Sequence, residues 1–113
     1  MTRAIVDAFC CTLPGAELGD PASGEHDAWK VGGKMFACIG IENVGVSVKT
    51  ADIESASFLI ELGRAEKAPY FHRSWVRVPW GLAERDELED RLRTSYEIVR
   101  AGLPKKVRDA LGD

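Results

Sequence analysis

Apolar residues recur with a helical period at the beginning of the chain. Ile5, Phe9 and Leu13 are four residues apart, so they lie along one stripe of a helix that we expect over about residues 3–12. A Leu-Pro-Gly sequence ends this helix, because proline disfavours helical conformation in the residue before it and glycine accepts the left-handed exit. Residues 19–27 are rich in turn-forming and acidic side chains, which predicts a surface loop with a short strand before it.

The clearest strand pattern lies between residues 28 and 49. Two apolar runs, AWKV and KMFACIGI, flank a Gly-Gly pair, and glycine supplies the positive φ angles that a two-residue hairpin turn needs. In the third run, Val44, Val46 and Val48 face one side and the residues between them face the other. We therefore expect a three-stranded meander with one face on the core and the other turned to water or to a partner.

The rest of the chain alternates between helical and extended patterns. We expect a helix over about residues 51–65, with Thr50 as its N-cap. Residues 66–74 predict a loop or an edge strand, because a proline there lacks the N–H of a strand ladder. The alternating sequence of residues 75–80 predicts a strand, and an apolar stripe predicts a long helix over about 83–101, followed by a short helical turn at KKVRDAL.

These elements and the composition define one domain. Helices and strands are segregated along residues 1–113, so the fold class is α+β with a mostly antiparallel sheet packed against helices. Hydrophobic residues make up 45% of the chain, which is typical of a globular domain, and no apolar run approaches the roughly 20 residues that span a bilayer. The beginning of the sequence does not have the pattern of a signal peptide. We expect a cytoplasmic protein without a membrane partner, either a monomer or a weak dimer.

The charge is slightly negative overall and uneven along the chain. Fifteen basic and eighteen acidic residues give a net charge of -3. Residues 28–80 carry seven basic and five acidic residues, so this part is positive, whereas residues 1–27 carry one basic and five acidic residues. A nucleic-acid-binding protein is usually basic or has a basic face. The sequence therefore restricts an anion-binding surface to the middle of the chain.

Motifs for catalysis, metals and cofactors do not occur in this sequence. It lacks the glycine-rich nucleotide loops, the nucleophile elbow of hydrolases and the zinc-protease motif. The three cysteines do not have zinc-ligand spacing, which favours reduced thiols, and Cys38 lies in an apolar run that predicts burial. We therefore assign no catalytic residue, metal or cofactor, and favour a binding protein over an enzyme.

Aromatic and cationic residues occur together on the predicted sheet. Rings that stack on bases and cations that contact phosphates are the elements of a nucleic-acid-binding surface. The candidate binding residues are Trp29, Lys30, Lys34, Lys49, Tyr70, His72, Arg73 and Trp75, with Arg77 as a weaker candidate. The alternative is that the tryptophans are core residues and that the cations are ordinary surface residues.

Four segments resemble one protein family. The sequences LPGA (13–16), WKVGGKMFA (29–37), PYFHRSWVRV (69–78) and SYEIV…LPKKVR (95–108) are similar in order and spacing to the MmcQ/YjbR-like family of small bacterial proteins. The resemblance implies the element order α-β(3)-α-β(2)-α, similar to secretion-chaperone-like folds, and a double-wing DNA-binding surface. The loop before the hairpin departs from the family, because it reads DPASGEH in place of an aromatic-Pro-Phe-Gly run.

The resemblance also implies which residues act. The matching motif positions are Trp29, Lys30, Gly32, Gly33, Lys34, Lys49, Tyr70, His72 and Trp75. We expect a non-enzymatic binding domain whose first candidate partner is DNA. Two alternatives stay open: a protein-interaction module that docks near residues 69–75, and a small-molecule or anion pocket around Lys49, His72 and Trp75.

Overall fold

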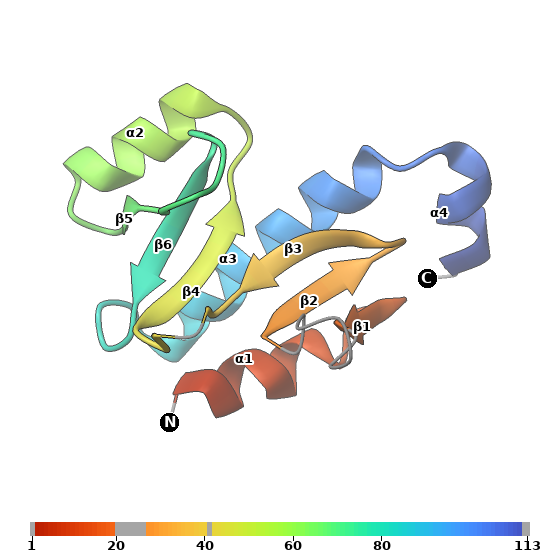
Figure 1. Ribbon diagram of the computed structural model, residues 1–113, viewed down its shortest axis with the longest axis horizontal. Helices are drawn as coiled ribbons and strands as arrows, with labels where there is room; N and C mark the ends of the chain where they lie inside the picture. The colour runs from red at the N-terminus through yellow and green to blue at the C-terminus, as the bar shows by residue number, and fades with distance from the viewer. Residues whose placement is uncertain (1, 20–26, 41, 112–113) are drawn as a thin grey trace.

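The chain folds into one six-stranded sheet with helices on one side. Figure 1 shows a computed structural model, which describes residues 2–19, 27–40 and 42–111. The acidic DPASGEH loop therefore lies outside the described residues. In chain order the elements are α1 (Thr2–Cys10), β1 (Ala16–Leu18), β2 (Ala28–Val31), β3 (Lys34–Cys38), β4 (Gly45–Lys49), α2 (Ile53–Glu61), β5 (Glu66–Lys67), β6 (Trp75–Pro79), α3 (Arg85–Ala101) and α4 (Lys105–Leu111).

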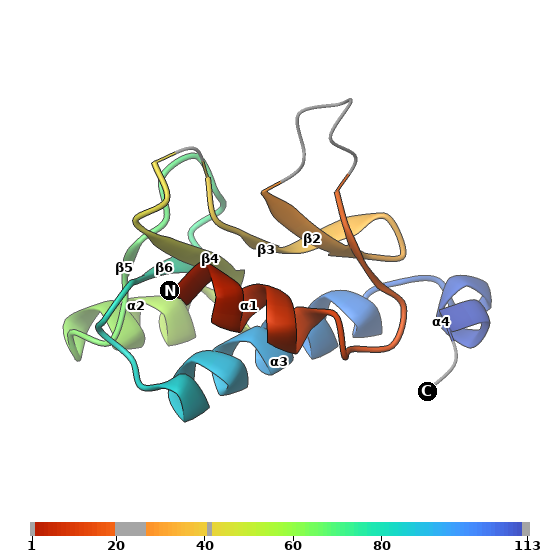
Figure 2. The same cartoon turned by 90° about the horizontal axis from the view of Figure 1, so that it is seen from below.

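The arrangement confirms the predicted α+β class. The strand order is β1-β2-β3-β4-β6-β5, and every neighbouring pair is antiparallel. Figure 2 shows the helices together below the sheet, which leaves the opposite face without a helix over it. Between the two layers, Phe36 packs edge-on against Tyr96 of α3, with ring centroids 5.4 Å apart, and Leu92 of α3 is completely buried. No described helix has the length and apolar content needed to cross a membrane.

The hairpin turn agrees with the sequence prediction, but the start of the second helix does not. Gly32 and Gly33 both have positive φ angles, 57° and 81°, as the predicted two-residue turn requires. The prediction that Thr50 caps the second helix is wrong. Asp52 is the N-cap, and its carboxylate accepts a 2.7 Å hydrogen bond from the N–H of Ser55. The Thr50 hydroxyl instead donates to the carbonyl of Ser74 at 2.7 Å, which holds the end of β4 against the segment before β6.

The sheet also contains more strands than the expected three-plus-two pattern. The short β1 adds a fourth strand to the first group, because Ala16–Leu18 pairs with β2. The segment over residues 66–74 starts with the two-residue edge strand β5 and continues as a loop. Both short strands agree with the sequence analysis, which expected a short strand before residues 19–27 and a loop or an edge strand over residues 66–74.

A buried serine joins the two halves of the sheet. β3 and β4 share only the register pairs Ala37–Val48 and Cys38–Ser47, after a register shift between β2 and β3, and the two halves fan apart in Figure 1. Ser95 of α3, which is fully buried, lies where the strands separate. Its hydroxyl donates to the carbonyl of Phe36 at 2.6 Å and accepts from the N–H of Lys49 at 2.8 Å. One side chain thus satisfies a backbone group on each diverging strand.

Candidate binding surface on the open face of the sheet

The strand register defines which side chains share the face that carries no helix. Val46 and Val78 are buried on the helix side, so the residues that alternate with them point the other way. Register partners in neighbouring strands lie on the same face. One row crosses the open face through Glu66, Arg77, Ser47, Cys38 and Ala28. A second row on this face contains Trp75 and Lys49. We call this surface the open face.

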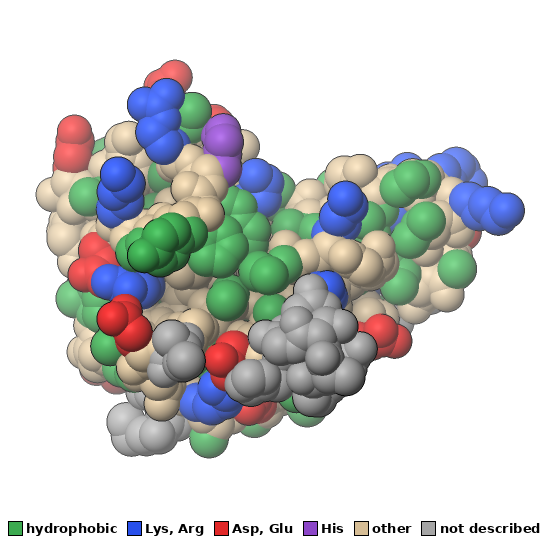
Figure 3. Space-filling model, in the orientation of Figure 1, with side chains coloured by type: hydrophobic (Ala, Val, Ile, Leu, Met, Phe, Trp, Pro, Cys, Tyr) green, Lys and Arg blue, Asp and Glu red, His purple; other side chains and the backbone are tan. Residues whose placement is uncertain are grey.

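An apolar cavity lies in the open face. It has a volume of about 430 Å³. Strands β3, β4 and β6 and their loops contribute one side, and the segment before β6 contributes the other. Figure 3 shows the corresponding green patch in a hollow between the two halves of the sheet, with both basic and acidic side chains around it. The lining residues are Cys38, Ile39, Gly40, Glu42, Val44, Ser47, Pro69, Tyr70, Phe71 and Arg77.

Three aromatic side chains stand at this cavity or beside it. Phe71 is stacked on Trp75, with centroids 4.6 Å apart and planes 21° from parallel. Tyr70 is fully exposed and has a φ of 70°, a left-handed conformation that is uncommon outside glycine. The loop therefore presents the Tyr70 ring to solvent and supports the Phe71 ring from behind with Trp75.

Lys49 and His72 meet at one hydroxyl beside the aromatic group. Nζ of Lys49 donates to Oγ of Ser74 at 3.0 Å, and Nδ1 of His72 lies 2.9 Å from the same oxygen. The N–H of Ser74 also points at this Nδ1, at 3.1 Å, so Nδ1 is an acceptor. A second cavity, of about 420 Å³, lies next to this cluster and is also lined by Asp52 and Glu54. The structure thus brings Lys49 and His72 together, but beside two carboxylates.

Two of the predicted cations on the open face have acidic neighbours. Arg77 is held by Glu66 of the adjacent strand, with Nε 2.5 Å from the carboxylate, so its charge is largely compensated. Lys30 is the register partner of Glu17 in β1. These pairs follow from the short strands β1 and β5, which each place an acid opposite a cation. The open face therefore carries less net positive charge than its cation count suggests.

The other predicted cations lie at different places around the sheet. Arg73 is exposed in the loop before β6. Lys34 is exposed at the hairpin tip, and its register partner Val31 is buried on the helix side. The alternation therefore assigns Lys34 to the other side of the sheet from Lys30 and Lys49. The candidate cations border the open face rather than forming one continuous positive patch.

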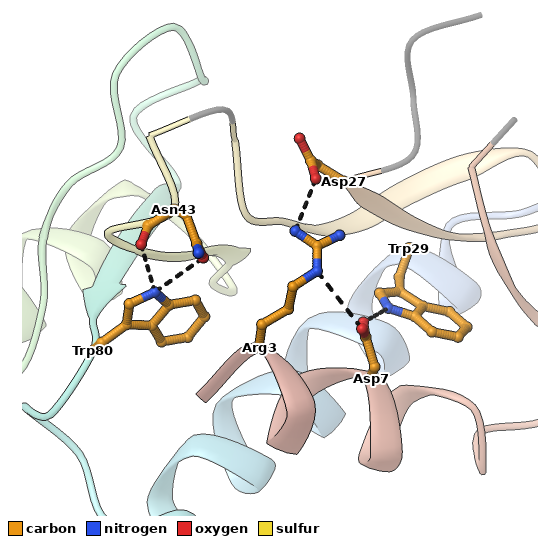
Figure 4. Close-up of polar contacts among 6 residues, drawn as sticks. All are labelled: Arg3, Asp7, Asp27, Trp29, Asn43 and Trp80. Atoms are coloured by element: carbon orange, nitrogen blue, oxygen red, sulfur yellow. Dashed lines mark hydrogen bonds and ion pairs between the residues drawn. The ribbon is translucent and has the colours of Figure 1, made fainter. Parts of the chain in front are cut away.

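Trp29 is part of the core and not of the open face. Its side chain is 8% exposed, and its indole Nε1 donates to the carboxylate of Asp7 in α1 at 2.9 Å. Figure 4 shows this contact together with Arg3, which bridges Asp7 and Asp27. The same figure shows that Trp80 donates to the backbone carbonyl of Asn43. The alternative interpretation, in which Trp29 is a core residue, is confirmed, whereas Trp75 lies half-buried on the open face.

A family model and a solved structure are similar to most of this chain. Residues 11–98 match the model of the YjbR family. The chain belongs to the YjbR family. A crystal structure of Deinococcus radiodurans protein DR2400, described as a DUF419 domain, is similar over 95% of this chain and 85% of that chain. The two share 25% sequence identity with a TM-score of 0.74. No curated protein matches the sequence.

The structure of this YjbR-family chain adds residues that the sequence did not indicate. Ser74, Ser47 and Phe71 belong to this surface. For Ser47 alone the sequence contained a hint, because the alternation in β4 placed it on the side away from the valines. The prediction that Cys38 is buried is wrong, because its side chain is half-buried and lines the open-face cavity. Desolvation still raises the pKa of the Cys38 thiol, so it stays protonated and is a poor nucleophile.

The described part of this YjbR-family chain also shows how its other ionisable groups are placed. No group of three His, Cys, Asp or Glu side chains among residues 2–19, 27–40 and 42–111 is arranged to hold a metal ion. All three cysteines are free thiols. Burial raises the pKa of Cys10 to about 12, so this thiol acts as a small apolar side chain between α1 and the core.

Proposed function

We propose that this YjbR-family protein is a nucleic-acid-binding domain that uses the open face of its sheet. One observation supports the proposal above all: the apolar hollow of the open face has aromatic rings at its edge and Lys and Arg side chains, with some acidic ones, around it (Figure 3). Rings offer stacking surfaces for bases, and the surrounding cations neutralise phosphates. Tyr70, one of the residues that the family resemblance selects, lines this hollow.

The candidate residues divide into two roles under this proposal. Lys49 and Arg73, with Lys30 farther across the sheet, contact phosphates around the hollow, and Lys34 contacts a strand that continues around the hairpin tip to the other side of the sheet. Tyr70 and His72 contact bases or sugars. The net charge of -3 is compatible with these roles, because the potential at a surface depends on the local arrangement of charges.

Fluorescence anisotropy with labelled DNA at about 50 mM salt tests the proposal. If four cations engage phosphates of a duplex, log K falls with log salt with a slope of roughly -3 to -4, because each neutralised phosphate releases counterions. The double variant Lys49→Gln, Arg73→Gln should weaken binding and reduce the magnitude of this slope by about 2. Glutamine at position 49 keeps a hydrogen-bond donor for Ser74, which limits the effect on stability.

A matched control removes two charges elsewhere. Lys105 and Lys106 are exposed on α4, and replacing both by glutamine gives the same change in net charge. The control should bind almost as tightly as the unmodified protein, because it changes only the total charge and not the charges at the open face. Absence of binding to both duplex and single strand at 50 mM salt would contradict the proposed function, and so would equal losses in the two double variants.

A further inference from the structure

We propose that the open-face cavity receives one unpaired base, so that the protein binds single-stranded nucleic acid more tightly than duplex. This inference rests on the proposed nucleic-acid binding and specifies its substrate class. It comes from three features of the cavity: its size, its exposed rings and its polar floor. Each of these features can contact the base itself, whereas the surrounding cations contact only the phosphates.

The size of the cavity suits a small flat group and excludes a duplex. Its volume of about 430 Å³ lies within the range of small-molecule sites in proteins. A base in a duplex is enclosed by its partner and its stacked neighbours, so it must leave the helix before it can enter such a hollow. A base in a single strand is already unpaired, and this difference favours the single strand.

The rings at the cavity match the flat faces of a base. Tyr70 is fully exposed, so its ring makes no apolar contacts of the kind that a buried ring makes. A base that stacked on the ring would supply them. Phe71 is held in place by its stacking on Trp75. The Tyr70 ring is therefore free to pack against a ligand, and the Phe71 ring is already fixed. Aromatic rings that are ordered before binding lose little entropy when a base stacks on them.

The floor of the cavity carries polar groups that match the edge of a base. Ser47 is 5% exposed, and it lines the cavity. Arg77, oriented by Glu66, and Glu42 line the same cavity, so donors and acceptors are both present. A base edge likewise carries donors and acceptors, whereas a purely apolar ligand would leave these groups unpaired.

The test compares a labelled 12-nucleotide single strand with a 12-base-pair duplex of the same sequence, by anisotropy at about 50 mM salt. The single strand should bind at least tenfold more tightly. Tyr70→Asn should weaken single-strand binding about tenfold and change duplex binding less than twofold, because asparagine tolerates the left-handed backbone but lacks the ring. Ser47→Ala should weaken single-strand binding several-fold and leave its salt slope unchanged.

A matched aromatic control lies on the other side of the molecule. Phe58 of α2 is 60% exposed on the helix layer, so Phe58→Ala should leave binding of both nucleic acids unchanged. Duplex binding equal to or tighter than single-strand binding would overturn this inference and leave the proposed function intact, and so would a Tyr70→Asn variant that binds the single strand normally. If neither nucleic acid binds, the proposed function fails, and this inference fails with it.

Discussion

The two faces of the sheet differ in purpose: one forms the core, and the other exposes polar, charged and aromatic side chains. On the helix-covered face, Val46, Val48, Val76 and Val78 are at most 1% exposed, and they pack with α3 into a continuous core. On the open face, the alternating positions of the same strands carry polar, charged and aromatic side chains around a hollow. Because neighbouring residues of a strand point to opposite faces, β4 and β6 serve both purposes at once.

This contrast explains why the open face can hold groups that a core would not tolerate. Ser47 and Ser95 are both almost completely buried, but their surroundings differ. Ser95 joins two backbone groups inside the covered layer, whereas Ser47 lies at the bottom of an open hollow. The Ser95 hydroxyl is therefore satisfied within the chain, whereas the Ser47 hydroxyl lines the open-face cavity.

The largest expected effect on stability comes from a large-to-small substitution in the core on the helix-covered face. Leu92 is 0% exposed and lies on the central stripe of α3, so Leu92→Ala removes buried methyl groups and leaves a cavity. We expect a loss of about 3–4 kcal/mol in the free energy of unfolding, measured by urea denaturation. Tyr70→Asn on the open face should cost less than about 0.5 kcal/mol. Similar losses in the two variants would show that the open-face loop is part of the stabilising core.

The two serines offer a sharper comparison, because the chemical change is the same. Ser95→Ala leaves the carbonyl of Phe36 and the N–H of Lys49 without their buried partner, so we expect a loss of about 2 kcal/mol. Ser47→Ala should change stability by less than about 0.5 kcal/mol, because its hydroxyl lines the open-face cavity. Thermal and urea unfolding measure both variants. A neutral Ser95→Ala would mean that water replaces the hydroxyl where the strands separate.

Much of the covered face was predictable from the sequence. The spacing of Leu88, Leu92 and Tyr96 indicated the buried stripe of α3, and all three are at most 5% exposed. The glycine pair of the hairpin required positive φ angles, which the structure has. Such signals are local and periodic, so a single sequence contains them.

The open face was harder to predict, because its properties arise between segments distant in sequence. Arg77 was a candidate phosphate contact, but the edge strand β5 brings Glu66 to it. Trp29 and Trp75 have similar sequence surroundings, but the register places one under α1 and the other on the open face. The meeting of Lys49 and His72 at Ser74 depends on the pairing of β4 with β6. Long-range register and side-chain pairing are not recorded in local patterns.

The smallest expected effect tests a charge cluster in the covered layer. Glu87 of α3 lies between Arg64 and Arg91, with Nε of Arg64 3.2 Å from the carboxylate. The hydrogen bond from Arg64, followed by the nearby positive charges, lowers the pKa of Glu87 below its usual value of 4.5. The folded state therefore favours the ionised form more than the unfolded state does. This contribution is complete above about pH 4.5 and disappears as the pH falls through the lower folded pKa.

Glu87→Gln should consequently reduce stability by less than about 1 kcal/mol at pH 7, since the cluster is partly exposed, and by much less at pH 3. Urea midpoints at the two pH values give this difference. Glu97→Gln is the matched control, because it removes a carboxylate that is exposed on the same helix. A Glu87→Gln effect that is equal at both pH values would indicate lost packing rather than a lost charge. The Glu87 cluster would then contribute to the covered face through packing and not through its charges.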